Sequence, residues 1–224
     1  MTIKDLLHSR AAMVSLLAVG AISFIPSATT WGGKHPEPSV YPLPTAWYLD
    51  FKHAKPKRIV VAVPGQKVPS AYWYLTYTVT NNTGKEIEFF PDFEMVTQDG
   101  KIHRSDHLIP LAVFEAIKRD SNKDLLVSAA NIAGALHQGE DQAKDGVAIW
   151  EEPMPRMGAF NIYVGGLNSE FTYAVDDKGV PLKDAEGKTI TLRKALELNY
   201  VIWGDEVKPG MDDVQVKKER WVMR

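Results

Sequence analysis

Two histidines separated by three residues form the pattern in this sequence that comes nearest to a metal site. His103 and His107 flank Arg104, Ser105 and Asp106. Imidazoles four residues apart share one face of a helix, and the Asp106 carboxylate would add a third donor of a kind that zinc accepts. Arg104, however, places a positive charge inside the cluster, and no third histidine is close in the sequence. A solvent-exposed loop explains these residues as well, and we expect no tight metal binding by them.

A second group of acidic residues follows the spacing of a calcium-binding loop. Asp141, Asp145, Gly146 and Glu152 occupy the first, fifth, sixth and twelfth positions of such a loop. Ala143 stands at the third position, where calcium needs an oxygen ligand, and the flanking segments have the pattern of strands rather than helices. A polar hairpin loop explains the same residues. We therefore predict no bound metal and no other cofactor.

An aromatic-rich segment offers a different kind of binding site. Residues 71–80 alternate in the manner of a β-strand, with Trp73, Leu75, Tyr77 and Val79 on one face and Tyr72, Tyr74, Thr76 and Thr78 on the other. One face of such a strand must belong to the core, and we expect it to be the face of Trp73 and Tyr77. Tyr72 and Tyr74 are then predicted to be exposed, where their rings would form a platform on which a sugar can stack.

Acidic pairs are the remaining candidates for catalysis. They occur at Glu151–Glu152, Asp176–Asp177 and Asp212–Asp213. A glycosidase needs two carboxylates that face each other across a cleft at roughly 5–10 Å, whereas neighbours along a strand point to opposite faces. The sequence also contains no G-x-S-x-G, H-E-x-x-H or Walker motif. It predicts no catalytic residue, and Gly165–Gly166 is too short a glycine run to indicate phosphate binding.

The composition narrows the class of protein. The chain has 224 residues, 45% of them hydrophobic and 24% charged, which is typical of a globular domain. Its formal net charge of −2 argues against a nucleic-acid partner, because phosphate contacts need a basic face. The absence of cysteine excludes disulfides, cysteine nucleophiles, cysteine-ligated zinc and iron–sulfur clusters.

The N-terminus has the pattern of an export signal. Residues 1–10 carry Lys4 and Arg10, and residues 11–25 carry no charge. Small residues follow Pro26, so we predict a signal peptide over residues 1–28 and an exported protein, either periplasmic or secreted. Cleavage after residue 28 places a proline where a small residue is preferred. An uncleaved N-terminal anchor therefore remains the alternative.

The rest of the chain divides into a linker and one domain. Residues 29–45 contain four prolines and two glycines, which disfavours both helix and central strand. For residues 46–224 we predict a mainly β domain with strands at 46–51, 58–63, 71–80, 86–90, 93–97, 132–137, 147–150, 160–164, 171–175, 196–203 and 214–222. We expect segment 132–137 to pair with segment 147–150. Short helical patterns, the clearest at Pro110–Arg119, interrupt the strands in an excursion over residues 103–130.

Two stretches resemble a known kind of domain. Residues 72–84, which read YWYLTYTVTNNTG, are similar to the signature strand and turn of immunoglobulin-like domains in exported bacterial proteins. Residues 132–140 with residues 146–150 are similar to the second hairpin of those domains. The resemblance implies an antiparallel immunoglobulin-like β-sandwich, of a family whose members are mostly uncharacterised and serve as binding or structural modules.

These observations favour a non-enzymatic exported module with a binding or structural role at the cell envelope. Its expected partner is a protein or a glycan, and it would touch a membrane only through an uncleaved N-terminal segment. Two alternatives remain open. One is a hydrolase acting on an extracellular or cell-wall polymer, with carboxylates from distant turns. The other is a membrane-tethered subunit of an envelope complex, with residues 11–26 as its anchor.

Overall fold

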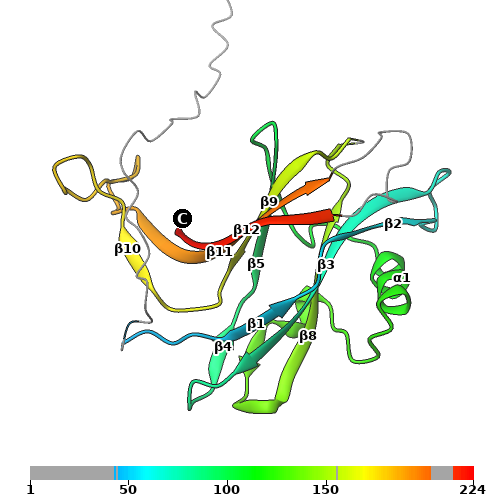
Figure 1. Cartoon of the computed structure of the whole chain (residues 1–224), viewed down its shortest axis with the longest axis horizontal. Helices are drawn as coiled ribbons and strands as arrows, with labels where there is room; N and C mark the ends of the chain where they lie inside the picture. The colour runs from blue at the N-terminus through cyan, green and yellow to red at the C-terminus, as the bar shows by residue number, and fades with distance from the viewer. Residues whose placement is uncertain (1–42, 44, 155, 203–213) are drawn as a thin grey trace, which may run out of the picture. The chain divides into compact units, whose positions relative to one another are not determined.

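The fold is described from a computed structural model, which covers residues 43, 45–154, 156–202 and 214–224. The predicted signal or anchor segment, nearly all of the predicted linker and the acidic pair Asp212–Asp213 lie outside the described residues. The described part of the chain is mainly β, with antiparallel sheets and two helices (Figure 1). None of its helices has the length and apolar character that a membrane crossing requires.

One sheet is built around the aromatic-rich strand. Its members are β1 (Asp50–His53), β2 (Lys57–Val61), β3 (Ser70–Asn81) and β8 (Gly139–Glu151). β1 and β2 pair with successive halves of β3 on one side, and β8 pairs with nearly its whole length on the other. Strand β3 is therefore central, as the density of β-branched and aromatic side chains predicts.

The other large sheet has six strands. They are β5 (Asp92–Thr97), β6 (Ile102–Arg104), β9 (Ala159–Gly165), β10 (Phe171–Tyr173), β11 (Thr191–Ile202) and β12 (Val214–Met223). The spatial order is β10-β11-β9-β5-β6, and β12 lies beside β11 as well. A separate pair is formed by β4 (Ile87–Phe89) and β7 (Gly134–Leu136). All of these pairings are antiparallel.

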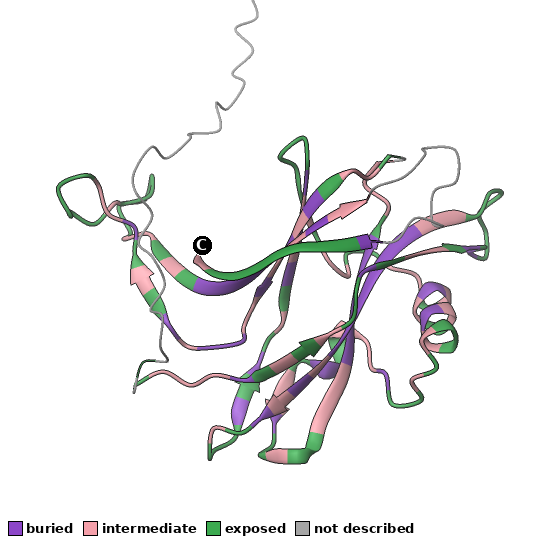
Figure 2. Ribbon diagram, in the orientation of Figure 1, coloured by how far each residue is buried: buried purple, intermediate pink, exposed green. Residues whose placement is uncertain are grey.

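The main core contains side chains from both large sheets. Trp73, Leu75, Tyr77 and Val79 of β3 are between 0% and 4% exposed, which confirms the predicted core face. Figure 2 shows that buried residues lie in strands of both large sheets. They share one hydrophobic cluster with Met95 of β5, Ile162 of β9 and Leu198 of β11. Alternate residues of every contributing strand enter this cluster, so each strand keeps one face free for other contacts.

The second face of β3 is buried too, and the predicted exposure of Tyr72 and Tyr74 is wrong. Their side chains are 3% and 2% exposed, because helix α1 (Leu111–Ser121) packs over them. Val113 of the helix joins them in a second hydrophobic cluster. The Tyr74 hydroxyl donates a hydrogen bond of 2.5 Å to Asp120. The excursion therefore completes the fold, and the two tyrosines offer no sugar platform.

The region after the helix also differs from the prediction. Residues 132–137 do not form one strand paired with residues 147–150, because helix α2 (Ala129–Ile132) precedes β7. Strand β7 pairs with β4, while residues 147–150 pair with β3. Gly134, with φ of +112°, adopts a backbone conformation that lets the chain leave the helix and enter the strand at once.

Candidate functional site

The histidine cluster does not lie on a helix. His103 belongs to β6, where it pairs with Met95, and Asp106 follows in a turn with φ of +60°. The helical face that a metal site would require is therefore absent, because His103 lies on β6, which continues the sheet beyond β5. His103 Nε2 is buried and has no hydrogen-bond partner within the described part of the chain.

The same segment nevertheless forms a pocket. His103, His107 and Glu151 line a cavity of about 460 Å³ beside Trp150, whose indole N–H donates to the His103 carbonyl. Within the described ranges, no group of three or more histidine or acidic side chains is arranged so that it could hold a metal ion. The structure thus brings the two histidines to one pocket, together with an acidic residue that the sequence did not associate with them.

Asp106 ties the two large sheets together. Its backbone N–H donates to the carbonyl of Ile149 in β8, and the Ser105 N–H donates to the carbonyl of Phe93 in β5. Burial raises the pKa of Asp106 to about 6, and hydrogen bonds with Ser105 and with the Ile149 backbone offset only part of that effect. This carboxyl is therefore held in a place that disfavours its charge.

The second part of the calcium-like segment is an extended strand, so its acidic residues do not converge on one point. Residues 144–151 pair one by one with β3, and at roughly 3.4 Å per residue Asp145 and Glu152 are about 24 Å apart, whereas Asp141 lies in a bulge before this stretch. Asp145 accepts hydrogen bonds from Thr78 and Lys123 at 2.5 and 2.8 Å. Neither a cation loop nor a hairpin loop extends over the whole of residues 141–152, because residues 144–151 form a strand paired with β3.

Glu152 has a structural partner at the end of β8. The Arg58 guanidinium binds its two carboxylate oxygens at 2.5 and 3.0 Å, and the indole of Trp73 adds a hydrogen bond of 3.3 Å. The hydrogen bond to Glu152 raises the pKa of Arg58. Both carboxylate oxygens are thus occupied, which ties Glu152 to β2 and β3.

A groove on the outer face of the six-stranded sheet is the strongest candidate for a binding site. The strand register explains how the groove arises. Gly165 of β9 lies opposite Asp92 of β5. On the other side of β9, Val164 pairs with Leu196 of β11, so the neighbouring residues Gly165 and Ala195 lie side by side. Leu196 faces the core, so Ala195 faces outward. Two adjacent strands thus lack large side chains at the same level, which leaves a depression in the sheet.

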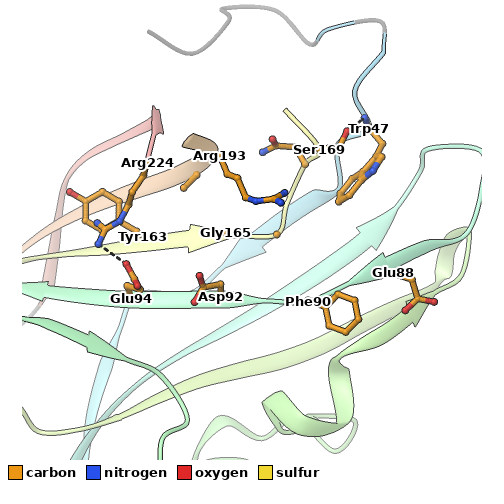
Figure 3. A pocket seen from close by; sticks show the side chains of 13 residues that line it. Trp47, Glu88, Phe90, Asp92, Glu94, Tyr163, Gly165, Ser169, Arg193 and Arg224 are labelled. Atoms are coloured by element: carbon orange, nitrogen blue, oxygen red, sulfur yellow. Dashed lines mark hydrogen bonds and ion pairs between the residues drawn. The ribbon is translucent and has the colours of Figure 1, made fainter. Parts of the chain in front are cut away.

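Larger side chains surround this depression. The cavity has a volume of about 570 Å³, within the range of small-molecule sites. Its lining includes Asp92, Glu94, Tyr163, Arg193 and Arg224 from the sheet, and Trp47 and Phe90 at one end (Figure 3). Carboxylates lie along β5 on one side, and the two arginines lie along the opposite side. The site is therefore a groove with walls of opposite charge.

Part of the wall is a fixed ion-pair network. Glu94 accepts a hydrogen bond of 2.5 Å from Arg224, and Arg104 Nε lies 3.4 Å from its other oxygen. The Arg224 guanidinium carbon stands 4.0 Å from the centre of the Tyr163 ring, in cation–π geometry. These contacts neutralise Glu94 and hold the Tyr163 ring and Arg224 in place.

The network continues across the sheet to its edge strand. Tyr163 donates a hydrogen bond of 2.9 Å to Glu197, which also accepts one from Arg220. Burial raises the pKa of Glu197, but the hydrogen bonds from Arg220, Tyr163 and Asn199 outweigh burial and leave that pKa lowered. Glu197 is therefore charged at neutral pH. The ion pairs, hydrogen bonds and cation–π contact that run from Arg104 through Glu94 and Tyr163 to Glu197 and Arg220 connect β6, β5, β9, β11 and β12 across the surface of the sheet.

The end of the groove is anchored by an ion pair beneath it. Lys194 and Glu170, each 4% exposed, lie 2.9 Å apart. Asn168 donates to the Lys194 carbonyl and accepts from the Glu170 backbone N–H. The backbone N–H of Trp47 donates to the Ser169 hydroxyl at 3.0 Å, which fixes the position of Trp47 in this wall. Hydrogen bonds of the lining residues Trp47, Asn168 and Ser169 thus hold this end of the groove in place.

Three charged side chains in the groove have no partner in the described part of the chain. The side chains of Glu88, Asp92 and Arg193 are exposed, and none of them makes a hydrogen bond or an ion pair there. Phe90, which is 63% exposed, adds a large apolar surface nearby. These groups remain available to a ligand.

Gly166 shows how closely the wall is packed. Its φ is +81°, and a Cβ built on it would lie 2.3 Å from the carbonyl oxygen of Phe90. Among the lining residues, only the pair Gly165–Gly166 stands out in the sequence, as a short run of glycine. The other lining residues come from segments far apart in the chain, which only the strand register brings together.

Comparisons of the chain with protein-family models, with curated proteins and with solved structures find no match.

Proposed function

We propose that this protein is a non-enzymatic, exported binding module of the cell envelope, with an immunoglobulin-like β-sandwich that holds its partner in the outer-face groove. The groove carries this proposal. Its paired charges are fixed by the network around Glu94, while Asp92 and Arg193 keep their hydrogen-bonding capacity for a ligand. A site that is already organised before binding loses little entropy when a ligand enters.

The turn after β3 supports the resemblance to exported domains. Asn81 is fully buried, and its side-chain amide donates to the carbonyls of Lys85 and Leu136. Its side-chain oxygen accepts from the backbone N–H and the hydroxyl of Thr83. The N-N-T-G sequence therefore closes the turn and attaches it to β7, which explains why the aromatic strand ends in this motif.

Co-sedimentation with insoluble envelope polymers tests the proposal. The mature chain is incubated with peptide-bearing cell-wall polymer, and the bound fraction is measured for the wild type and for Ala195→Trp, which fills the groove. Val60→Trp is the matched control, because Val60 is already 54% exposed on β2. The proposal predicts that the wild type and the Val60 variant sediment and the Ala195 variant stays soluble. Equal binding by all three proteins would contradict it.

A hydrolase is the second candidate, and the pocket lined by His103, His107 and Glu151 favours it. Release of soluble fragments from the same polymer measures this activity directly. Loss of that release in His107→Ala, with sedimentation unchanged, would establish the hydrolase. Absence of release from the wild type supports the binding module.

Export and tethering are tested by mass spectrometry of the protein made in a bacterial host. The proposed module predicts a mature chain that begins near residue 29 and is recovered outside the cytosol. An intact Met1 in the membrane fraction would identify the membrane-tethered subunit instead.

A further inference from the structure

The unpaired charges of the groove specify the kind of ligand. We infer that the groove binds a short extended peptide with a free amino group and a free carboxylate, its ammonium directed to Asp92 and its carboxylate to Arg193. This inference rests on the proposed binding function and names the chemical class of the partner.

The two sides of the groove carry charges of opposite sign. Asp92 and Arg193 stand on opposite sides of the floor made by Gly165 and Ala195, in the row of β5 and the row of β11 (Figure 3). Glu88 adds a second carboxylate on the Asp92 side. A ligand with a single charge would be attracted by one wall of the groove and repelled by the like charge on the other wall.

The distance between Asp92 and Arg193 matches the length of a short peptide. Strands lie about 4.8 Å apart and residues on one face repeat about every 6.8 Å along a strand. The Cα atoms of Asp92 and Arg193, two strands and two residues apart, are thus separated by about 12 Å. Both side chains project from these positions, which leaves a span suited to two or three extended residues at about 3.4 Å each.

One end of the groove is apolar. Phe90 is 63% exposed beside the half-buried Trp47. A side chain of the peptide would cover this surface, which would otherwise remain in contact with water. Arg193 can hold a carboxylate through two parallel N–H donors, since a guanidinium matches the geometry of a carboxylate. Arg224 is already engaged with Glu94, so Arg193 is the available anchor.

Calorimetric titration with three synthetic peptides tests the ligand class. The peptides are Ala-Phe-Ala, its N-acetyl form, which lacks the ammonium, and its C-terminal amide, which lacks the carboxylate. With the wild type, each modification should weaken binding by about three- to tenfold, the range expected for a charge-assisted hydrogen bond near the surface. Ala195→Trp should bind none of the three.

Two variants assign each end of the peptide to its wall. In Asp92→Asn the N-acetyl form and the parent peptide should bind equally, while the amide still binds more weakly. In Arg193→Gln the amide and the parent should bind equally, while the N-acetyl form still binds more weakly. Modifications that have no effect on the wild type, or whose effects persist unchanged in the matching variants, would overturn the inference.

The source of the peptide is separated by a last pair of measurements. Cell-wall polymer that carries its peptides, and the same polymer after enzymatic removal of those peptides, are compared in the sedimentation assay. Binding that disappears with the peptides identifies the polymer as the source, whereas binding of free Ala-Phe-Ala alone identifies soluble peptides. If Ala195→Trp abolishes sedimentation but both polymers bind the wild type equally, the groove is the binding site and the ligand class is wrong.

Discussion

Replacing Asp106 by asparagine should stabilise the protein at neutral pH. Burial raises the pKa of this carboxyl from 3.8 to about 6, so the folded state holds its proton more tightly than the unfolded state does. Between those two values the stability of the wild type should fall as pH rises, because the folded state binds more protons than the unfolded state. Above pH 6 the ionised carboxylate is a constant cost.

The magnitude follows from the two pKa values. A difference from 3.8 to about 6 corresponds to about 3 kcal/mol at neutral pH. Asparagine carries no charge at any pH and keeps one side-chain oxygen that can accept a hydrogen bond. We therefore expect Asp106→Asn to raise the free energy of unfolding by about 1–3 kcal/mol at pH 7.5. Near pH 4 the advantage should be close to zero.

Urea unfolding followed by tryptophan fluorescence measures this difference at pH 4, 5, 6 and 7.5. Asp99→Asn is the control of opposite sign, because hydrogen bonds from Thr97 and Lys101 lower the pKa of Asp99 to about 2. Its carboxylate stabilises the fold above the unfolded pKa, and that stability is lost as pH falls toward 2. An Asp106→Asn variant that is less stable than the wild type at pH 7.5, or whose effect does not change with pH, would refute the reasoning.

Three further predictions concern packing and metals. Trp73→Ala should lower the free energy of unfolding by roughly 3–5 kcal/mol because its side chain is 4% exposed in the main core; a loss below 1 kcal/mol in urea unfolding would contradict that packing. Gly166→Ala should cost more than Gly84→Ala, since both need a positive φ but only the former drives a Cβ into the Phe90 carbonyl; equal melting temperatures would exclude the clash. Thermal melts with excess calcium and with chelator should coincide, because the pairing of residues 144–151 with β3 holds Asp145 and Glu152 far apart; a rise of several degrees with calcium would show a site that the strand geometry does not provide.

The sequence predicted the parts of the fold that depend on local pattern. The alternation over residues 71–80 placed Trp73 and Tyr77 in the core, and the structure confirms both. The helical spacing after Pro110 predicted α1 to within two residues. In each case the period of the apolar residues is set by the element itself, so no distant contact is needed to recognise it.

Tertiary contacts explain what the sequence did not predict. Tyr72 and Tyr74 alternate with the core residues of β3, as residues on an exposed face do, but α1 covers them. The sequence of the strand alone does not indicate that a helix packs on this face. Segment 141–152 has the spacing of a calcium loop, yet backbone pairing with β3 holds residues 144–151 extended. An acidic composition cannot distinguish a loop from a strand whose outward side chains are acidic.

The groove could not be predicted from the sequence for a related reason. Gly165 and Ala195 are small residues thirty positions apart, and neither is unusual in its own segment. Only the pairing of β9 with β11 places them side by side and creates a depression. Asp92 and Arg193 gain significance from that register alone, because each is an ordinary surface charge in its own strand.

The most direct test of the groove as the binding site is a nitrogen-15 chemical-shift titration of the mature protein with soluble peptide-bearing fragments of cell-wall polymer. The account predicts that the largest shifts belong to the amides of Gly165, Gly166, Arg193 and Ala195. Shifts centred instead on His107 and Glu151, with the groove amides unchanged, would contradict it.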